Sequence, residues 1–324
     1  MKNRPKLELH LHLEGAASPA FIKGLAAEKK LDISGIFDER GNYAYADFAG
    51  FLDVYEAATQ ALKTPEDYAR LTTAVLQDCA EHGVVYAETF LSPDFCGGRD
   101  VGAWREYLAA IQEAAAAMEP HITLRGCVTA IRHFGPERSR ETAICAAETA
   151  GDFITGFGIA GAETVGAPRD FAWAFDCARE AGLGLTAHAG EWGGAAMVRD
   201  TLDQLPGISR IGHGVQAIND RALCDRLIEN DITLEVCPGS NVALGVVPSW
   251  AAHPIEKLRA RGVKVTVSTD DPPFFHTTMT NEYDRLAHHF GWEDEIFREV
   301  EQNALEAAFC SAETRAIIAK RLQS

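Results

Sequence analysis

The chain has 324 residues, of which 47% are hydrophobic and 24% charged, a composition typical of a folded protein. Its length suits either one (β/α)8 barrel or two ordinary domains. With 30 Lys and Arg against 47 Asp and Glu, the net charge of −17 disfavours binding to nucleic acid or to an anionic membrane surface. Glu8, His10 and His12 interrupt the apolar run that a signal peptide needs, so we expect a cytoplasmic protein.

The eight cysteines are spread along the chain without a CxxC pair. In a chain without a secretory context, this spacing predicts small buried thiols rather than disulfides. Zinc-finger spacing is absent as well, so any metal ion is expected to be held by other side chains.

Short β-rich runs alternate with helical segments along the whole chain. In chain order, the predicted strands are Leu7–Leu13, Val84–Leu91, Thr123–Ile131, Ile154–Ala160, Gly184–His188, Arg210–Gly212, Ile232–Val236 and Lys264–Ser268. The predicted helices between them include Glu66–Glu81, Glu137–Thr149, Asp170–Ala181, Asp220–Glu229 and His253–Arg261. Several of these helices stop at a glycine that leads into the next strand, which is typical of repeated βα units and a parallel sheet.

Eight such units predict an α/β protein with a closed (β/α)8 TIM barrel. A doubly wound sheet is the competing fold, but no GxGxxG or GxxxxGK[ST] motif follows any predicted strand. Two regions exceed the repeat: Leu31–Thr64, predicted as a helical insertion after the first unit, and Thr280–Ser324, predicted as a C-terminal helical extension. Because no linker-like stretch interrupts the chain, residues 1–324 are predicted to form one domain.

Polar motifs stand at the carboxyl ends of the predicted strands, which converge on the active site of a barrel. In His10-Leu11-His12, residues two apart on a strand face the same side, so both imidazoles point into the barrel mouth. A chance HxH pattern is the competing interpretation. His188 closes an apolar strand and is followed by Glu191, which could instead be an ordinary acidic residue at a helix N-terminus.

Two further motifs lie at later strand ends. His213 stands between two glycines that allow close approach of a ligand, although it could equally be a turn histidine. Asp270 and Asp271 are adjacent carboxylates that repel each other unless a cation or a shared proton compensates, or unless they lie in a solvated loop. Taken together, histidine and carboxylate ligands without thiolates favour a catalytic zinc site with one position left for water.

With these motifs in place, the sequence resembles the adenosine deaminase family of the metal-dependent amidohydrolase superfamily. The motifs that carry the resemblance are Leu9–Gly15, His188–Glu191, Ile211–Gly214, Ser240–Val242 and Thr269–Pro272, and they occur in the family's order. The similarity runs through nearly the whole chain. It implies a zinc-dependent enzyme that hydrolytically deaminates a 6-aminopurine.

By this resemblance the metal ligands are His10, His12, His188 and Asp270. Some members of the superfamily bridge two metals with a carboxylated lysine at the end of the fourth strand. Phe153–Gly161 contains no lysine, so one zinc ion per subunit is the better prediction.

The resemblance also implies the catalytic residues. Glu191 is expected to donate a proton to purine N1, while His213 and Asp271 orient the water and stabilise the tetrahedral adduct. The backbone N–H of Gly161 is expected to contact purine N3. His12, a predicted metal ligand, and Asp271, which follows a ligand but is not expected to be one, are also expected to contact the substrate.

Phe48 and Phe51 fall on one face of a predicted helix within the insertion. This helix is either an apolar lid over the purine or an ordinary amphipathic helix packed on the barrel. Phe274 and Phe275, after the aspartate pair, are further candidates for the wall of the same cavity. His253 is expected to have a structural role.

Glu14 occupies the position where typical adenosine deaminases carry an aspartate that contacts the ribose, and we expect it to bind the substrate. Relatives that act on free adenine tend to have glutamate there. We favour adenosine and 2′-deoxyadenosine, which would give inosine or its deoxy form plus ammonia, over adenine or an N6-substituted adenine. The sequence is also compatible with a cyclic-amide hydrolase or a catalytically silent zinc-binding protein. The expected partners are the purine and water, and the oligomeric state is left open.

Overall fold

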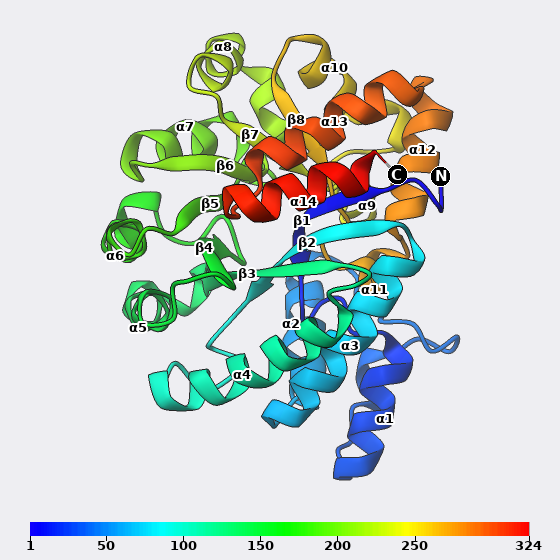
Figure 1. Cartoon of the computed structure of the whole chain (residues 1–324), viewed down its shortest axis with the longest axis vertical. Helices are drawn as coiled ribbons and strands as arrows, with labels where there is room; N and C mark the ends of the chain where they lie inside the picture. Colours follow the sequence, from blue (N-terminus) through cyan, green and yellow to red (C-terminus); the bar gives the residue numbers. More distant parts are fainter. Residues whose placement is uncertain (324) are drawn as a thin grey trace.

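A computed structural model describes residues 1–323 of the chain. Eight parallel strands follow one another around a sheet in the order β1 to β8 (Figure 1). They are β1 (Lys6–His12), β2 (Val84–Leu91), β3 (Thr123–Ile131), β4 (Ile154–Ala160), β5 (Gly184–Ala189), β6 (Ile208–His213), β7 (Thr233–Val236) and β8 (Lys264–Val267). A parallel bridge between Leu11 and Asp270 joins the first strand to the segment after the last. The predicted TIM barrel is confirmed.

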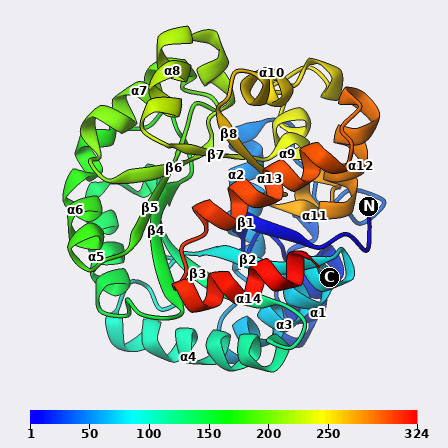
Figure 2. The same cartoon turned by 45° about the horizontal axis from the view of Figure 1, so that its top comes forward.

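Helices surround the strands, and most of them lie against the outer face of the sheet (Figure 2). They are α1 (Pro19–Lys29), α2 (Phe48–Thr59), α3 (Pro65–Glu81), α4 (Val101–Met118), α5 (Pro136–Ala147), α6 (Ala172–Glu180), α7 (Gly194–Gln204), α8 (Arg221–Glu229), α9 (Pro238–Ala243), α10 (Ile255–Ala260), α11 (Pro272–Phe275), α12 (Met279–Phe290), α13 (Asp294–Ala307) and α14 (Ala312–Leu322). The predicted helix Asp170–Ala181 starts differently, because Pro168–Phe171 forms a separate 3-10 turn before α6.

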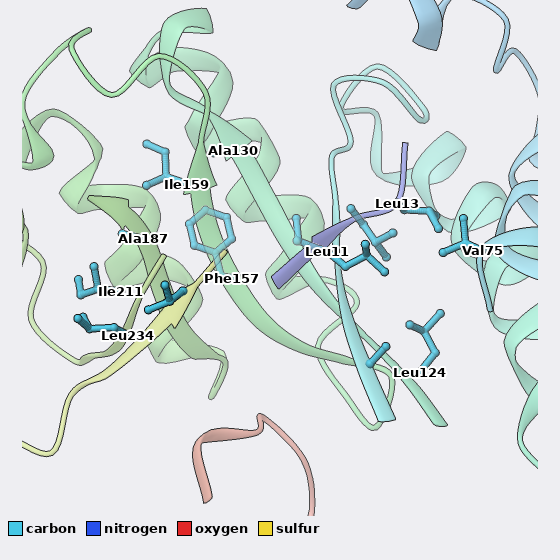
Figure 3. Close-up of a cluster of buried hydrophobic side chains, with 14 of the residues drawn as sticks. Leu11, Leu13, Val75, Leu124, Ala130, Phe157, Ile159, Ala187, Ile211 and Leu234 are labelled. Atoms are coloured by element: carbon cyan, nitrogen blue, oxygen red, sulfur yellow. The ribbon is translucent and has the colours of Figure 1, made fainter. Parts of the chain in front are cut away.

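The alternation of side chains along each strand divides the barrel into two environments. On β1, Leu7, Leu9 and Leu11 alternate with Glu8 and His10, and all five are buried. Since successive residues point to opposite faces, the leucines lie on one face and the polar pair lies on the other, in the barrel interior. Figure 3 shows the apolar layer, to which each of several strands contributes side chains. The interior is left for polar residues, which positions a polar site at its carboxyl end.

The region between β1 and α3 contains α1, a 3-10 turn at Ser34–Ile36, and α2. The side chain of Asp47 accepts a hydrogen bond from the backbone N–H of Gly50 and so caps the start of α2. The aromatic residues Phe48, Phe51 and Tyr55 follow at helical spacing and lie together in space. These three aromatic side chains line the cavity at the mouth of the barrel.

The segment after α12 closes the opposite end of the barrel, where α13 and α14 lie across the strands (Figure 2). The ring of Phe309, between α13 and α14, fills the space beside Gly156 and Gly184 at the amino ends of β4 and β5. A Cβ atom built on Gly184 would meet this ring at 2.3 Å, and one built on Gly156 at 2.8 Å. Only glycine leaves room for Phe309 at these two positions.

The eight cysteines are all free, as predicted, and six of them are buried. No helix within residues 1–323 is both long and apolar enough to cross a membrane.

Candidate active site

Four side chains from three strand ends converge at the mouth of the barrel: His10 and His12 from β1, His188 from β5, and Asp270 after β8. The His12 Nε2 atom lies 3.3 Å from Asp270 Oδ1 and 3.3 Å from His188 Nε2. His10 Nε2 lies 3.6 Å from Asp270 Oδ1. The structure therefore brings together the four residues predicted as metal ligands.

His213, from the end of β6, is as close to this centre as the four predicted ligands. Its Nε2 atom lies 3.8 Å from Asp270 Oδ2, and it forms with His10, His188 and Asp270 a group whose ligand atoms all lie within 4.8 Å of one another. His12 belongs instead to a second such group, with Asp270 and Asp271. Asp270 is common to both groups, so one ion beside it can draw ligands from either.

The hydrogen bonds of His10 show that its inner nitrogen is available as a metal ligand. Its Nδ1 atom lies 2.7 Å from a carboxylate oxygen of Glu235, so Nδ1 carries the proton and donates it. The Nε2 atom then carries a lone pair, is fully buried without a hydrogen-bond partner, and faces the carboxylate of Asp270. Two acceptors face each other here, which is the arrangement that a cation between them satisfies.

Two residues of the centre adopt backbone conformations that only glycine takes easily. His213 has φ +60° and Asp270 has φ +69°. Each such residue costs on the order of 1–3 kcal/mol, which the surrounding barrel must supply. Both side chains belong to the same cluster of groups that could hold a metal.

Burial sets the protonation of the site. It holds the pKa of His188 well below its ordinary value and lowers that of His213 to about 3, so both imidazoles are neutral and can act as ligands or acceptors. Burial opposes ionisation of Asp270, but the neighbouring side chains of His10 and His12 outweigh it and hold the Asp270 pKa well below its usual range. The pKa of Asp271 is raised well above its ordinary value by burial and by the neighbouring Asp270 charge.

Glu191 follows β5 and lies inside the same cavity. Its buried position raises its pKa well above the ordinary value, and the charges of Asp270 and Glu163 add to this effect. The amide nitrogen of Asn241 lies 3.4 Å from Glu191 Oε1 and 3.2 Å from His213 Nδ1, and His253 Nε2 in turn lies 3.2 Å from the amide oxygen of Asn241. This chain of contacts fixes the orientation of Glu191 and His213, and it is consistent with the structural role predicted for His253.

The loop that carries Glu191 is held by Glu163, a residue whose role the sequence did not indicate. The carboxylate of Glu163 accepts hydrogen bonds from four consecutive backbone N–H groups, those of Gly190, Glu191, Trp192 and Gly193. Glu163 is buried, so these bonds are shielded from water. No local spacing reveals the contact, because Glu163 lies 27 residues or more from the loop that it binds.

A second network missed by sequence reasoning lies beneath the centre in the barrel interior. Glu235 Oε1 lies 2.6 Å from Arg210 Nε, and Arg210 Nη1 lies 2.7 Å from Glu88 Oε2. All three side chains are at most 1% exposed. Arg210 also stacks 3.5 Å above the ring of Phe309. One arginine thus pairs with two buried carboxylates, and the network connects His10 to the closed end of the barrel.

A cavity of about 580 Å³, including its open mouth, leads from the solvent to the cluster of histidine and aspartate side chains. Its walls include Phe48, Phe51 and Tyr55 from α2, so this helix covers the cavity. The aromatic contacts extend toward the solvent, because the ring centroids of Phe48 and the partly exposed Trp192 lie 5.4 Å apart. The size suits a small planar ligand between apolar walls.

Gly161 and Glu14, both predicted to contact the substrate, differ in their position relative to the cavity. Gly161 lines the cavity with φ +90°, and a Cβ there would lie 2.6 Å from His133 Nδ1, so only glycine fits. Glu14 is buried, and its Oε1 accepts a hydrogen bond from the Tyr68 hydroxyl at 3.1 Å; it is not among the described residues that line the cavity. Burial raises the pKa of Glu14 to about 7.

The prediction that Phe274 and Phe275 line the cavity is wrong. Phe274 is buried and stacks on Tyr43 with ring centroids 3.9 Å apart, and Phe275 packs against Phe51 at 5.3 Å. Among the described residues, neither ring reaches the cavity wall. Both rings contact Phe51 of α2, with centroids 5.5 and 5.3 Å away, and so form a layer behind this helix.

The family model described as Adenosine deaminase matches residues 5–324. The chain belongs to the adenosine deaminase family. The prediction of a deaminase of the amidohydrolase superfamily is therefore confirmed at the level of the family.

Members of this family with full-length similarity carry a narrower name. The chain is 46% identical over 320 residues to a protein of Rhizobium leguminosarum bv. trifolii named adenine deaminase, with 98% of each chain covered. A protein of Chelativorans sp. with the same name is 46% identical over 321 residues, again with 98% of each chain covered. Our first expectation, adenosine as the substrate, is not confirmed by these relatives.

Solved structures agree with the fold and with a metal site. The crystal structure of an adenine deaminase from Arthrobacter aurescens is 29% identical, with a TM-score of 0.89, and the match covers 99% of this chain and 98% of that one. An amidohydrolase from Burkholderia ambifaria with bound zinc is 27% identical, with a TM-score of 0.86 and coverages of 99% and 91%. The side chains that could hold a metal in this chain are the histidine and aspartate groups described above.

Proposed function

We propose that this protein deaminates adenine hydrolytically, giving hypoxanthine and ammonia. The observation that carries the proposal is the 46% identity, over 98% of both chains, to proteins named adenine deaminase. The position of Glu14 supports it as well. In relatives that use the nucleoside, the corresponding residue contacts the ribose, whereas Glu14 bonds to Tyr68 and does not line the cavity of the described chain.

The proposed metal is zinc, with His10, His12, His188 and Asp270 as its ligands. The unpartnered, buried Nε2 of His10 and the convergence of neutral imidazoles on Asp270 fit this assignment. When bound, the ion supplies a Lewis acid that makes a water molecule nucleophilic near neutral pH.

The remaining residues of the cavity have distinct roles in this proposal. Water adds to C6 of the purine, and N1 must gain a proton as the ring loses its aromaticity. Glu191 lies in the cavity with a carboxyl group whose pKa is raised well above its ordinary value, so it can hold a proton and donate it to N1. His213 and Asp271 are assigned to the side of the purine from which water attacks C6. The neutral imidazole of His213 and the unpartnered Oδ1 atom of Asp271 can hold this water there.

The proton that the attacking water gives up to Asp271 or His213 passes to the amino group, so that the C6–N bond breaks and ammonia leaves. The C6 hydroxyl loses its proton as the carbonyl forms, and this proton restores the carboxyl group of Glu191 while N1 keeps the proton that it received. The apolar rings of α2 exclude bulk water from the base and favour a flat aromatic substrate.

A substrate panel tests the proposal. The purified enzyme, loaded with zinc, is given adenine, adenosine, 2′-deoxyadenosine and an N6-substituted adenine, and kcat/KM is measured from the change in ultraviolet absorbance. We expect adenine to exceed both nucleosides by at least about 100-fold, the discrimination that a site of this type achieves readily. A higher kcat/KM for adenosine than for adenine would refute the proposal.

A further inference from the structure

The polar groups that line the cavity fall into two separate sets. One set is the metal-ligand cluster with Glu191, His213 and Asp271. The other is a single pair, Glu56 on α2 and His133 after β3. The rest of the described lining is apolar or glycine, apart from the hydroxyl of a tyrosine on α2. A bound purine that places C6 at the first set therefore has one other charged contact available, the Glu56–His133 pair.

Hydrogen bonds fix the protonation pattern of this pair. His133 Nδ1 accepts a hydrogen bond from the backbone N–H of Ala162 at 3.2 Å, so the ring proton is on Nε2. That Nε2–H faces Glu56 Oε1 at 3.2 Å. His133 is itself held against the backbone at Gly161, where no side chain would fit.

Glu56 then has one carboxylate oxygen to spare. No other described residue bonds to its side chain, which is 43% exposed and lines the cavity. A carboxylate can only accept hydrogen bonds, so the ligand group that fits it is an N–H or O–H donor, and a phosphate is repelled. The His133 contact orients the carboxylate and reduces the entropy lost when it binds such a donor.

The geometry of adenine supplies such a donor on the correct side. In the fused ring, C6 and N1 lie at one end and N9 at the other, so a base whose C6 faces the metal ligands turns N9 away from them. A free base carries a hydrogen on N9, whereas a nucleoside carries the sugar there instead.

We propose that Glu56, oriented by His133, is a specificity subsite that accepts a hydrogen bond from the N9–H of a free 6-aminopurine base. The proposal rests on the proposed function and deepens it, since it names the residue that selects bases over 9-substituted purines. Glu56 does not touch the reacting C6, so it acts on recognition and not on the chemical step.

The test compares adenine with 9-methyladenine, which differs only by a methyl group in place of the N9 hydrogen. We expect the wild-type enzyme to prefer adenine in kcat/KM by about 10- to 100-fold, the range for one charge-assisted hydrogen bond. In Glu56→Gln, which keeps the size of the side chain but not its charge, we expect this ratio to fall about tenfold or more. The matched control is Asp53→Asn, which removes the same charge from an exposed position of α2 and should leave the ratio unchanged.

The outcomes separate the two proposals. If Glu56→Gln keeps the wild-type ratio, the preference comes from steric exclusion of the methyl group and the Glu56 subsite is refuted. If Glu56→Gln lowers kcat/KM equally for both compounds, the subsite is also refuted, while adenine as the substrate still stands. A wild-type enzyme that prefers adenosine to adenine refutes the proposed function itself.

Discussion

Glu235 offers the sharpest test of how the barrel interior supports the metal centre. Both of its carboxylate oxygens are occupied: Oε2 binds His10 Nδ1 at 2.7 Å, and Oε1 binds Arg210 Nε at 2.6 Å and the Thr186 hydroxyl at 2.9 Å. In Glu235→Gln only one of these positions keeps an oxygen. The amide NH2 must face either the His10 nitrogen or the Arg210 guanidinium.

Each orientation has a cost that follows from this geometry. If the amide donates to His10 Nδ1, the ring proton moves to Nε2, and His10 loses the lone pair that points at Asp270. If the amide faces Arg210, two donors oppose each other in a buried site. Replacing a residue that orients a metal ligand typically weakens metal binding about 10- to 100-fold, and we expect a loss within that range for Glu235→Gln.

The assay titrates the metal-free protein with zinc in competition with a chromogenic chelator. The matched control is Glu88→Gln, which removes the same charge from the other side of Arg210 but does not touch His10. Both variants should lower the free energy of unfolding by about 3 to 5 kcal/mol, because each leaves Arg210 with one buried carboxylate. Only Glu235→Gln should weaken zinc binding. Equal zinc affinity in Glu235→Gln and the wild type, or an equal loss in Glu88→Gln, would refute the reasoning.

Three other predictions follow from single residues. Glu191→Gln should lower kcat by about 100- to 10,000-fold, because it removes the proton donor, and should leave the zinc content unchanged, because Glu191 is not a proposed ligand. Rate measurements and elemental analysis of the same sample check this prediction. Near-normal turnover would contradict it. Glu163→Gln should lower kcat about 10-fold or more with normal zinc content, because the amide cannot accept hydrogen bonds from all four N–H groups of the loop that carries Glu191. A change confined to KM would argue against a role of Glu163 in positioning this loop. Burial raises the pKa of Glu282 to about 8. The folded state thus keeps a proton that the unfolded chain loses near its ordinary value of 4.5, and wild-type stability falls as pH rises between these values. Glu282→Gln, which cannot ionise, should therefore gain stability relative to the wild type in urea unfolding as pH rises from about 5 to about 9, by on the order of 5 kcal/mol. Parallel pH profiles for the two proteins would show that Glu282 does not titrate in this range.

The sequence was sufficient for the barrel and for the convergence of His10, His12, His188 and Asp270 at one end of it, because both depend on local signals. Each strand is a short apolar run ended by polar residues, and the parallel order of the strands places these ends side by side. His10 and His12 share a strand, so their common orientation follows from the two-residue period alone. The agreement at Asp270 has the same origin, since it closely follows a predicted strand.

The supporting residues could not be predicted because their partners are distant in the chain. Glu163 contacts a loop 27 to 30 residues away, and Glu235 contacts His10 across 225 residues. Both resemble ordinary acidic or strand residues in isolation. The error at Phe274 arose in the same way, since its aromatic character is visible in the sequence but the turn of α11 that buries it is not.

Phe309 has a consequence for the order in which the protein forms during synthesis. The ring that plugs the amino end of the barrel, and the backbone N–H at the same residue that binds Glu88, lie after all eight strands in the chain. While the ribosome is still translating the segment before residue 309, the charges of Arg210 and Glu88 remain accessible to water from below. The burial of these charges is therefore complete only when the segment around Phe309 is in place.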